Sequence, residues 1–103
     1  IVFHPVAQPV WVLGDKTQMN RLFTNLIRNA IESVPAGNTP TIDVRLHTDA
    51  QNITVSVKDN GSGIEPDLRD KIFEPNFTTK TSGTGLGLAM CKGIVEQMKG
   101  SIW

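Results

Sequence analysis

The longest amphipathic pattern in the chain lies between Asp15 and Pro35. Apolar residues recur there at intervals of three and four, as they do along one face of an α-helix. They are Met19, Leu22, Phe23, Leu26, Ile27, Ala30, Ile31 and Val34. Asp15 can cap the first turn, and Gln18 stands three residues later, which is a capping-box arrangement with Asp in place of Ser or Thr. Pro35 and Gly37 end the pattern, so we predict one long helix with a buried apolar face.

Two later stretches alternate apolar with polar residues, which is typical of half-buried β-strands. Their apolar positions are Ile42, Val44 and Leu46 in the first and Ile53, Val55 and Val57 in the second. The loop TDAQN at 48–52 joins them, so we predict an antiparallel hairpin with one face left to cover the long helix. Nearer the start, the pieces IVF and VWV are interrupted by Pro5 and Pro9, which favours edge strands.

A second amphipathic helix is predicted after Gly87, with Leu88, Cys91, Val95 and Met98 on one face and Gly100 as its C-terminal stop. Because Cys91 lies in that apolar stripe, we interpret it as a core residue, and Met90 and Met98 likewise. The segment EPDLRDKIF at 65–73 is predicted to be a short helix or turn opened by Pro66.

Five of the nine glycines stand at positions 61, 63, 83, 85 and 87, around a polar loop that contains Lys80. Such clustering means that the backbone either approaches something closely or turns with a positive φ, although loop punctuation and an ordinary Asn-Gly turn are simpler explanations. Glycine amides at the start of a helix suit phosphate, and Lys80 could add a point charge. No GxxxxGK[ST] motif occurs, so this would not be a P-loop.

Asp59 ends the second strand beside these glycines and has only acceptor oxygens when ionised, which suits the exocyclic amine of adenine. Guanine would present a carbonyl oxygen instead, and an unsatisfied pair of acceptors costs roughly 1–3 kcal/mol, so we expect ATP to be preferred over GTP. Asn25 and Asn29 lie one turn apart on the flank of the long helix. They are either half-exposed border residues or amide oxygens near Mg²⁺.

Composition limits the other possibilities. The 103 residues carry ten basic and ten acidic side chains, so no charge excess points to nucleic acid or to direct membrane contact. The single cysteine and the lack of an apolar run of about 20 residues predict a cytoplasmic setting for this domain, whether or not its parent is membrane-anchored. We expect residues 1–103 to be one domain cut from a longer protein, with a final strand truncated.

Four segments in order resemble the motifs of the catalytic and ATP-binding (HATPase) domain of sensor histidine kinases, in the GHKL ATPase superfamily. NLIRNA (25–30) resembles the N box, DNGSGI (59–64) the first glycine box, FEPNFTTK (73–80) the F box and GTGLGL (83–88) the second glycine box. The short FTTK loop is most similar to kinases of the nitrogen-regulation type. The resemblance implies an α/β two-layer sandwich, with a mixed sheet of about five strands covered on one face by about three helices.

The same resemblance implies that Mg-ATP binds between the asparagine helix and the loop. Asn29 would be the Mg²⁺ ligand, Asn25 its helper near the phosphates, and Lys80 would touch the γ-phosphate. Asp59 would recognise adenine. The implied nucleotide contacts are Asp59, Gly61, Gly63, Ile64, Phe73, Phe77, Thr78, Thr79, Lys80, Gly83, Thr84, Gly85, Leu86, Gly87 and Leu88.

The implied activity is that of a protein-histidine kinase. The γ-phosphate would pass to a histidine on a separate dimerisation domain of a homodimeric parent, and then to the receiver domain of a response regulator. Neither His4 nor His47 stands in the His-Glu or His-Asp context of such an acceptor, so the fragment is expected to bind ATP without phosphorylating itself.

Three positions bear on the transfer of these roles. Glu32 stands where many members carry a phosphate-binding lysine, so that contact is either missing or made by another group such as Arg28 or Lys80. Asn76 replaces the hydrophobic or aromatic residue often found in the F box. Members that hydrolyse ATP usually place a glutamate at position 25, and Asn25 cannot act as that base. The alternatives are a GHKL ATPase, a GHKL protein serine kinase, and a nucleotide-sensing module without transfer activity.

Overall fold

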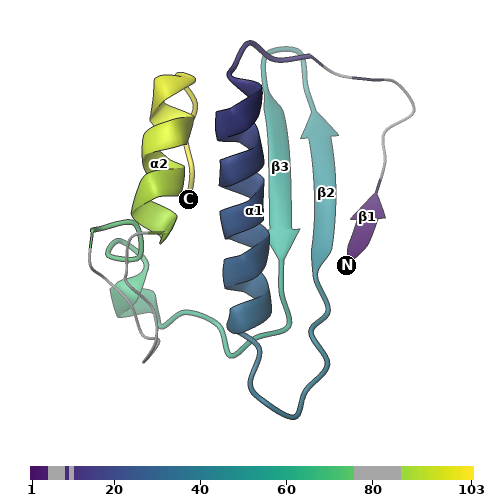
Figure 1. Ribbon diagram of the computed structural model, residues 1–103, viewed down its shortest axis with the longest axis vertical. Helices are drawn as coiled ribbons and strands as arrows, with labels where there is room; N and C mark the ends of the chain where they lie inside the picture. Colours follow the sequence, from purple (N-terminus) through teal and green to yellow (C-terminus); the bar gives the residue numbers. More distant parts are fainter. Residues whose placement is uncertain (5–8, 10, 76–86) are drawn as a thin grey trace. The chain divides into compact units, whose positions relative to one another are not determined.

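The structure is a computed structural model that describes residues 1–4, 9, 11–75 and 87–103. Along the chain it contains β1 (Val2–His4), α1 (Lys16–Glu32), β2 (Asp43–Thr48), β3 (Ile53–Lys58), a 3₁₀ turn η1 (Pro66–Leu68) and α2 (Gly87–Gln97) (Figure 1). These elements fall into two compact units. The sheet unit comprises Ile1–Val12 and Ile27–Gly63, and the helical unit comprises Leu13–Leu26 and Ile64–Trp103, so α1 contributes to both.

Helix α1 begins where its sequence predicts. Asp15 caps it, because its Oδ1 accepts hydrogen bonds from the backbone N–H of Thr17 at 2.8 Å and of Gln18 at 3.2 Å. The return half of a capping box is missing: Oε1 of Gln18 is buried and has no hydrogen-bond partner among the described residues. The helix ends at Glu32, two residues before the apolar pattern does, and Ile31 is 39% exposed rather than part of the core.

The sheet unit holds a mixed sheet with the strand order β1-β2-β3 (Figure 1). Strand β1 pairs in parallel with β2, with Val2 beside Asp43, which confirms the first predicted edge strand. The second predicted piece is not a strand in its described part, because Trp11 and Val12 belong to no element and are exposed. Among the described residues of this unit, Ala30 and Ile42 are the buried apolar ones.

Strands β2 and β3 form the predicted antiparallel hairpin, with a register that runs from Asp43 opposite Lys58 to Thr48 opposite Ile53. The loop is one residue shorter than predicted, since Thr48 still belongs to β2. Asp49 organises it: its Oδ1 accepts hydrogen bonds from the backbone N–H of Gln51 at 2.8 Å and of Asn52 at 2.7 Å. These two bonds stabilise the carboxylate and lower the pKa of Asp49 below its ordinary value of 3.8.

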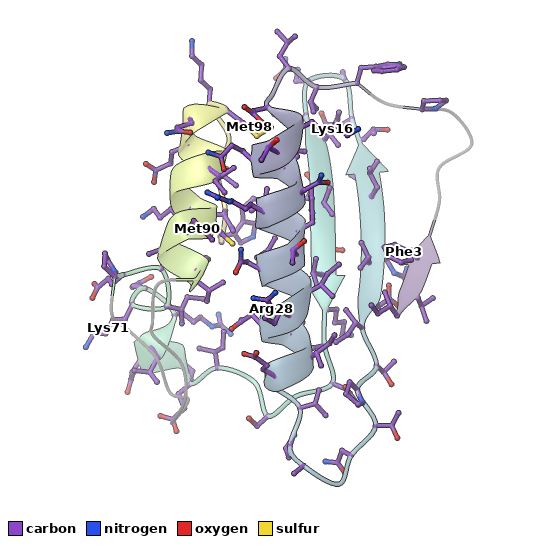
Figure 2. All side chains as sticks on the ribbon, in the orientation of Figure 1. Phe3, Lys16, Arg28, Lys71, Met90 and Met98 are labelled. Carbon is purple, nitrogen blue, oxygen red and sulfur yellow. The ribbon has the colours of Figure 1, made fainter. Side chains whose placement is uncertain are left out.

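The core of the helical unit is formed by Leu22, Cys91 and Ile94. Cys91 is fully buried and its Sγ donates to the carbonyl oxygen of Leu22 at 3.7 Å, which confirms its interpretation as a core residue. Burial also raises the pKa of the Cys91 thiol. Met98 packs against this core as predicted. Met90, on the same helix (Figure 2), is 37% exposed, so its prediction as a core residue is wrong. The other half-buried residues packed there are Met19, Phe23, Leu26, Val95 and Ile102.

Helix α2 ends near the predicted stop, but a different residue turns the chain. Lys99 has a φ of 60°, in the left-handed region, and its N–H donates to the carbonyl of Glu96 at 2.9 Å. The N–H of Gly100 donates to the carbonyl of Val95 at 2.9 Å, which completes a Schellman motif. Gly100 therefore closes the motif, and Lys99 occupies the position that normally favours glycine.

The sheet is mixed, as the resemblance implies. The structure does not confirm the expected number of strands. The described residues contain three strands and two α-helices, against about five strands and about three helices expected from the resemblance. The third helical segment in the described part is the short turn η1, which Pro66 opens as predicted. Neither described α-helix is long and apolar enough to cross a membrane.

Candidate functional site

Asp59 directly follows β3, and its side chain folds back on its own loop. Its Oδ1 accepts a hydrogen bond from the backbone N–H of Gly61 at 2.8 Å. The side chain is half-buried, and among the described residues its second oxygen, Oδ2, has no hydrogen-bond partner. One oxygen therefore fixes the orientation of the carboxylate, and the other remains able to accept from a ligand. An acceptor of this kind fits the exocyclic amine of adenine.

The two glycines of this loop are needed for different reasons. A Cβ added at Gly61 would lie 2.6 Å from both the backbone oxygen and Oγ of Ser33, which is closer than real Cβ contacts come. Gly63 has open space around it, but its φ of 82° lies in the left-handed region. Both explanations offered for the glycine cluster, close approach and positive φ, therefore apply here, each at one position.

Ser33 connects this loop to the C-terminal end of α1. Its backbone N–H donates to the carbonyl of Asn29 at 3.1 Å, and its Oγ donates to the carbonyl of Ala30 at 2.7 Å. Within the sheet unit, the loop that carries Asp59 thus packs against Ser33, which directly follows α1. Asn29 lies on the last turn of that helix. The structure brings Asp59, Gly61 and the end of the asparagine helix together within this unit.

Asn60, between Asp59 and Gly61, bridges to a segment that lies between α1 and β2. Its Oδ1 accepts a hydrogen bond from the backbone N–H of Thr41 at 2.8 Å, and its Nδ2 donates to the carbonyl of Thr39 at 3.0 Å. Sequence reasoning missed both Asn60 and Ser33. Asn-Gly is an ordinary turn signal, and a Ser after a helix is an ordinary boundary residue, so neither carried a distinguishing pattern.

In the helical unit, Asn25 lies beside the first residue of α2. Its Nδ2 donates to the carbonyl of Arg21 at 2.8 Å, which fixes the amide, and its Oδ1 is 3.8 Å from the position that a Cβ on Gly87 would take. Asn25 and Asn29 are both half-buried, one turn apart on α1, as expected for residues that flank the apolar stripe. Arg28 lies on the same helix and is exposed (Figure 2).

The remaining predicted site residues are placed only in part. Ile64 is 50% exposed, Phe73 and Leu88 are half-buried, and Glu32 is exposed. The others lie outside the described residues: Asn76, Phe77, Thr78, Thr79, Lys80, Gly83, Thr84, Gly85 and Leu86.

The described residues contain no cluster of side chains of the kind that usually binds a metal ion. Within residues 1–4, 9, 11–75 and 87–103, no three His, Cys, Asp or Glu side chains are grouped so that they could hold a metal ion. Magnesium at a nucleotide does not require such a group, because it keeps several waters and is held by few protein oxygens together with phosphates. The amide oxygens on α1 are hard oxygen donors of the kind that suits this ion.

Residues 14–103 match the protein family described as histidine kinase-, DNA gyrase B- and HSP90-like ATPase. Among curated proteins, the chain is similar to sporulation kinase A of Bacillus subtilis, with 42% identity over 90% of this chain and 15% of that protein. It is also similar to the sensory histidine kinase/phosphatase NtrB of Azospirillum brasilense, with 38% identity over 97% of this chain and 28% of that protein. The chain thus spans less than a third of the length of each of these relatives.

Solved structures show the same likeness at the level of the fold. The catalytic domain of histidine kinase ThkA, in a nucleotide-free form, superposes with a TM-score of 0.73 at 40% identity, covering 84% of this chain and 56% of that one. The mycobacterial sensor histidine kinase MprB superposes with a TM-score of 0.76 at 32% identity, covering 85% of this chain and 58% of that one. The α/β arrangement described above is therefore that of these kinase structures.

Proposed function

Because the chain belongs to the histidine kinase-, DNA gyrase B- and HSP90-like ATPase family, of the GHKL superfamily, we propose that residues 1–103 are the ATP-binding catalytic domain of a sensor histidine kinase. In this proposal the domain binds Mg-ATP and presents the γ-phosphate to a histidine on a separate dimerisation domain of the same parent. The phosphoryl group then passes to an aspartate on a response regulator. The similarity to a sporulation kinase and to a sensory histidine kinase/phosphatase supports this proposal.

The observation that carries the proposal is the orientation of Asp59. Its Oδ1 is already engaged by the N–H of Gly61 at 2.8 Å, so the carboxylate is held before any ligand arrives. Such an acceptor discriminates between purines: it pairs with the amine of adenine and opposes the carbonyl oxygen of guanine. An unpaired buried acceptor costs roughly 1–3 kcal/mol, which corresponds to about a 5- to 150-fold preference for ATP.

The phosphates are proposed to be held by Asn25, Lys80 and the glycine amides at 83–87, with Asn29 as the protein ligand of Mg²⁺. The amide oxygen of Asn25 already lies beside Gly87, the first residue of α2, where backbone N–H groups are not used within the helix. Magnesium, when bound, would neutralise charge on the phosphates and help to orient the terminal one. The contribution of the protein is then positioning rather than covalent chemistry.

The side chain at position 25 favours transfer to a protein over hydrolysis. An amide has no pKa near neutrality and cannot take a proton from water, so Asn25 cannot activate a water molecule as a carboxylate would. The terminal phosphate is therefore proposed to go to a side chain of the dimerisation domain. The isolated chain is expected to bind ATP without phosphorylating itself, since neither His4 nor His47 has the context of an acceptor.

Titration calorimetry of the chain with ATP and GTP, with and without Mg²⁺, tests this function. We expect ATP to bind more tightly than GTP by about tenfold or more, and Mg²⁺ to strengthen binding. Asp59→Asn should abolish most of the preference, because an amide can donate to the guanine carbonyl. Asp49→Asn, the same change at the far end of the hairpin, should keep it. Wild-type protein that binds ATP and GTP equally, or neither, would overturn the proposal.

A further inference from the structure

Asn60 is the one residue of the Asp59–Gly61 turn whose side chain points back to an earlier part of the chain. Its Oδ1 accepts from the N–H of Thr41 at 2.8 Å, and its Nδ2 donates to the carbonyl of Thr39 at 3.0 Å. Its two partners lie 19 and 21 residues earlier in the sequence, in the connection between α1 and β2. Both polar atoms of the amide are therefore engaged with the backbone of the same short segment.

The chemistry of this contact requires an amide. A backbone N–H can only donate and a backbone carbonyl can only accept, so one side chain must accept from Thr41 and donate to Thr39 at the same time. Asparagine does both with a rigid planar group. Aspartate would keep the first bond and would place a charged oxygen against the carbonyl of Thr39, and serine has a single polar atom for the two partners.

The bridge acts on the turn that orients Asp59. Gly61 lies against Ser33 on one side, where a Cβ would come within 2.6 Å, and Asn60 ties the same turn to Thr39 and Thr41. The N–H of Gly61 in turn donates to Oδ1 of Asp59 at 2.8 Å. The position of the Asp59 carboxylate therefore depends on a turn that is held in place at two residues, Asn60 and Gly61.

We propose that Asn60 is a positioning residue that sets the preference for adenine over guanine nucleotides, by holding the Asp59–Gly61 turn in the geometry that recognises the purine. This inference rests on the proposed function, since it assumes that Asp59 reads the base. This effect requires no contact between Asn60 and the nucleotide, because both polar atoms of the amide are engaged with Thr39 and Thr41. Its effect reaches the ligand through the direction in which Asp59 presents its free oxygen, and a supporting group of this kind decides whether a site is tight or loose.

A purely structural role would have a different signature. Asn60 is exposed and both of its hydrogen bonds are exposed, so water can replace much of what they contribute to folding. Loss of the bridge is then expected to lower the melting temperature by only several degrees. A change that acts on stability alone lowers the binding of ATP and GTP in proportion, whereas a displaced Asp59 lowers ATP binding selectively.

The test is to measure Kd for ATP and for GTP by calorimetry on the 103-residue chain and on Asn60→Ala, Asn60→Asp and Asp49→Ala, with the melting temperature of each. Asp49→Ala is the matched control, because it also removes two side-chain to backbone hydrogen bonds at the other end of the same hairpin. We expect the ATP-to-GTP affinity ratio to fall about threefold or more in Asn60→Ala. It should fall less in Asn60→Asp and stay unchanged in Asp49→Ala.

The outcomes separate this inference from the proposed function. If the wild type prefers ATP and Asn60→Ala keeps the same ratio, the positioning role is refuted while the proposed function stands. If Asn60→Ala does not fold, Asn60→Asp decides, because it retains the bond to Thr41, and an unchanged ratio there refutes the role as well. A wild type without any preference overturns both.

Discussion

Gly61→Ala is expected to destabilise the protein by overpacking, although alanine is the smallest possible addition. The new Cβ would lie 2.6 Å from the backbone oxygen and Oγ of Ser33 and 2.9 Å from Oδ1 of Asp59. Carbon and oxygen atoms pack favourably at about 3.5 Å, so all three contacts are repulsive and one of the three atoms belongs to the backbone. Overpacking of this kind costs roughly 1–3 kcal/mol, which for a chain of this size lowers the melting temperature on the order of 10 °C.

Gly93→Ala provides a control with the same chemical change and the opposite expected sign. Gly93 lies inside α2, is exposed, and has nothing within 4 Å of the added Cβ. Alanine is favoured over glycine in a helix interior by about 0.8–1 kcal/mol, so this variant should be more stable than the wild type. Thermal unfolding of both variants by circular dichroism, with urea denaturation to obtain the free energy of unfolding, gives the comparison.

A double variant shows whether Ser33 is the source of the repulsion. Ser33→Ala removes Oγ but leaves the backbone oxygen at 2.6 Å, so it should relieve only part of the cost of Gly61→Ala. The coupling free energy of the double-mutant cycle should therefore be favourable but smaller than the cost of Gly61→Ala alone. If Gly61→Ala is as stable as the wild type, the close packing of this turn on the end of α1 is refuted.

Two further variants probe the ends of α2 and of the hairpin. Lys99→Gly should raise the free energy of unfolding by about 0.5–1 kcal/mol, because Lys99 has a left-handed φ of 60°, and Lys99→Ala should give no such gain in the same urea titration. Asp49→Asn should reduce the loss of stability at acid pH. The pKa of Asp49 in the folded protein is lowered from 3.8, so the ionised carboxylate stabilises the fold above that pH. This stabilisation is lost as the pH falls through the lower folded pKa. Melting temperatures of wild type and variant between about pH 5 and pH 2 check this, and parallel curves would contradict it.

The features that sequence predicted well depend on local periodicity. The apolar spacing of α1 and its Asp15 cap, and the alternation of β2 and β3, involve residues that are close in the chain and have one favoured arrangement. The errors lie at the borders of these patterns. Ile31 continues the helical stripe of α1, yet it is exposed, because spacing gives the direction of a side chain and not the extent of the core that covers it. Met90 is also exposed, and it lies outside the three-and-four spacing of Leu88, Cys91, Val95 and Met98, so its apolar side chain alone did not place it in the core.

The Asp59–Gly63 loop could be predicted only as a list of residue types. The sequence identified Asp59 as an acceptor, and it identified glycines that allow either a close approach or a positive φ. Gly61 makes the close approach, and Gly63 has the positive φ. The sequence could not identify Ser33 as the group that Gly61 approaches, nor Thr39 and Thr41 as partners of Asn60, because these contacts join residues that are about 20 to 30 positions apart. Such pairings follow from the tertiary fold.

The triplet Asp59-Asn60-Gly61 is thus three contacts with different purposes rather than one glycine-rich motif. Gly61 provides the space for packing against Ser33 and Asp59, and its N–H orients the Asp59 carboxylate, so its replacement should lower stability and base preference together. Asp59 supplies the acceptor, so its replacement should affect mainly affinity and base preference. The side chain of Asn60 hydrogen-bonds to the backbone of Thr39 and Thr41 and yet should alter base preference, because it fixes the turn whose N–H orients the carboxylate. Stability and base preference, measured on single replacements of Asp59, Asn60 and Gly61, can therefore separate packing, recognition and positioning. Similarity of the motif sequence alone does not distinguish these three roles.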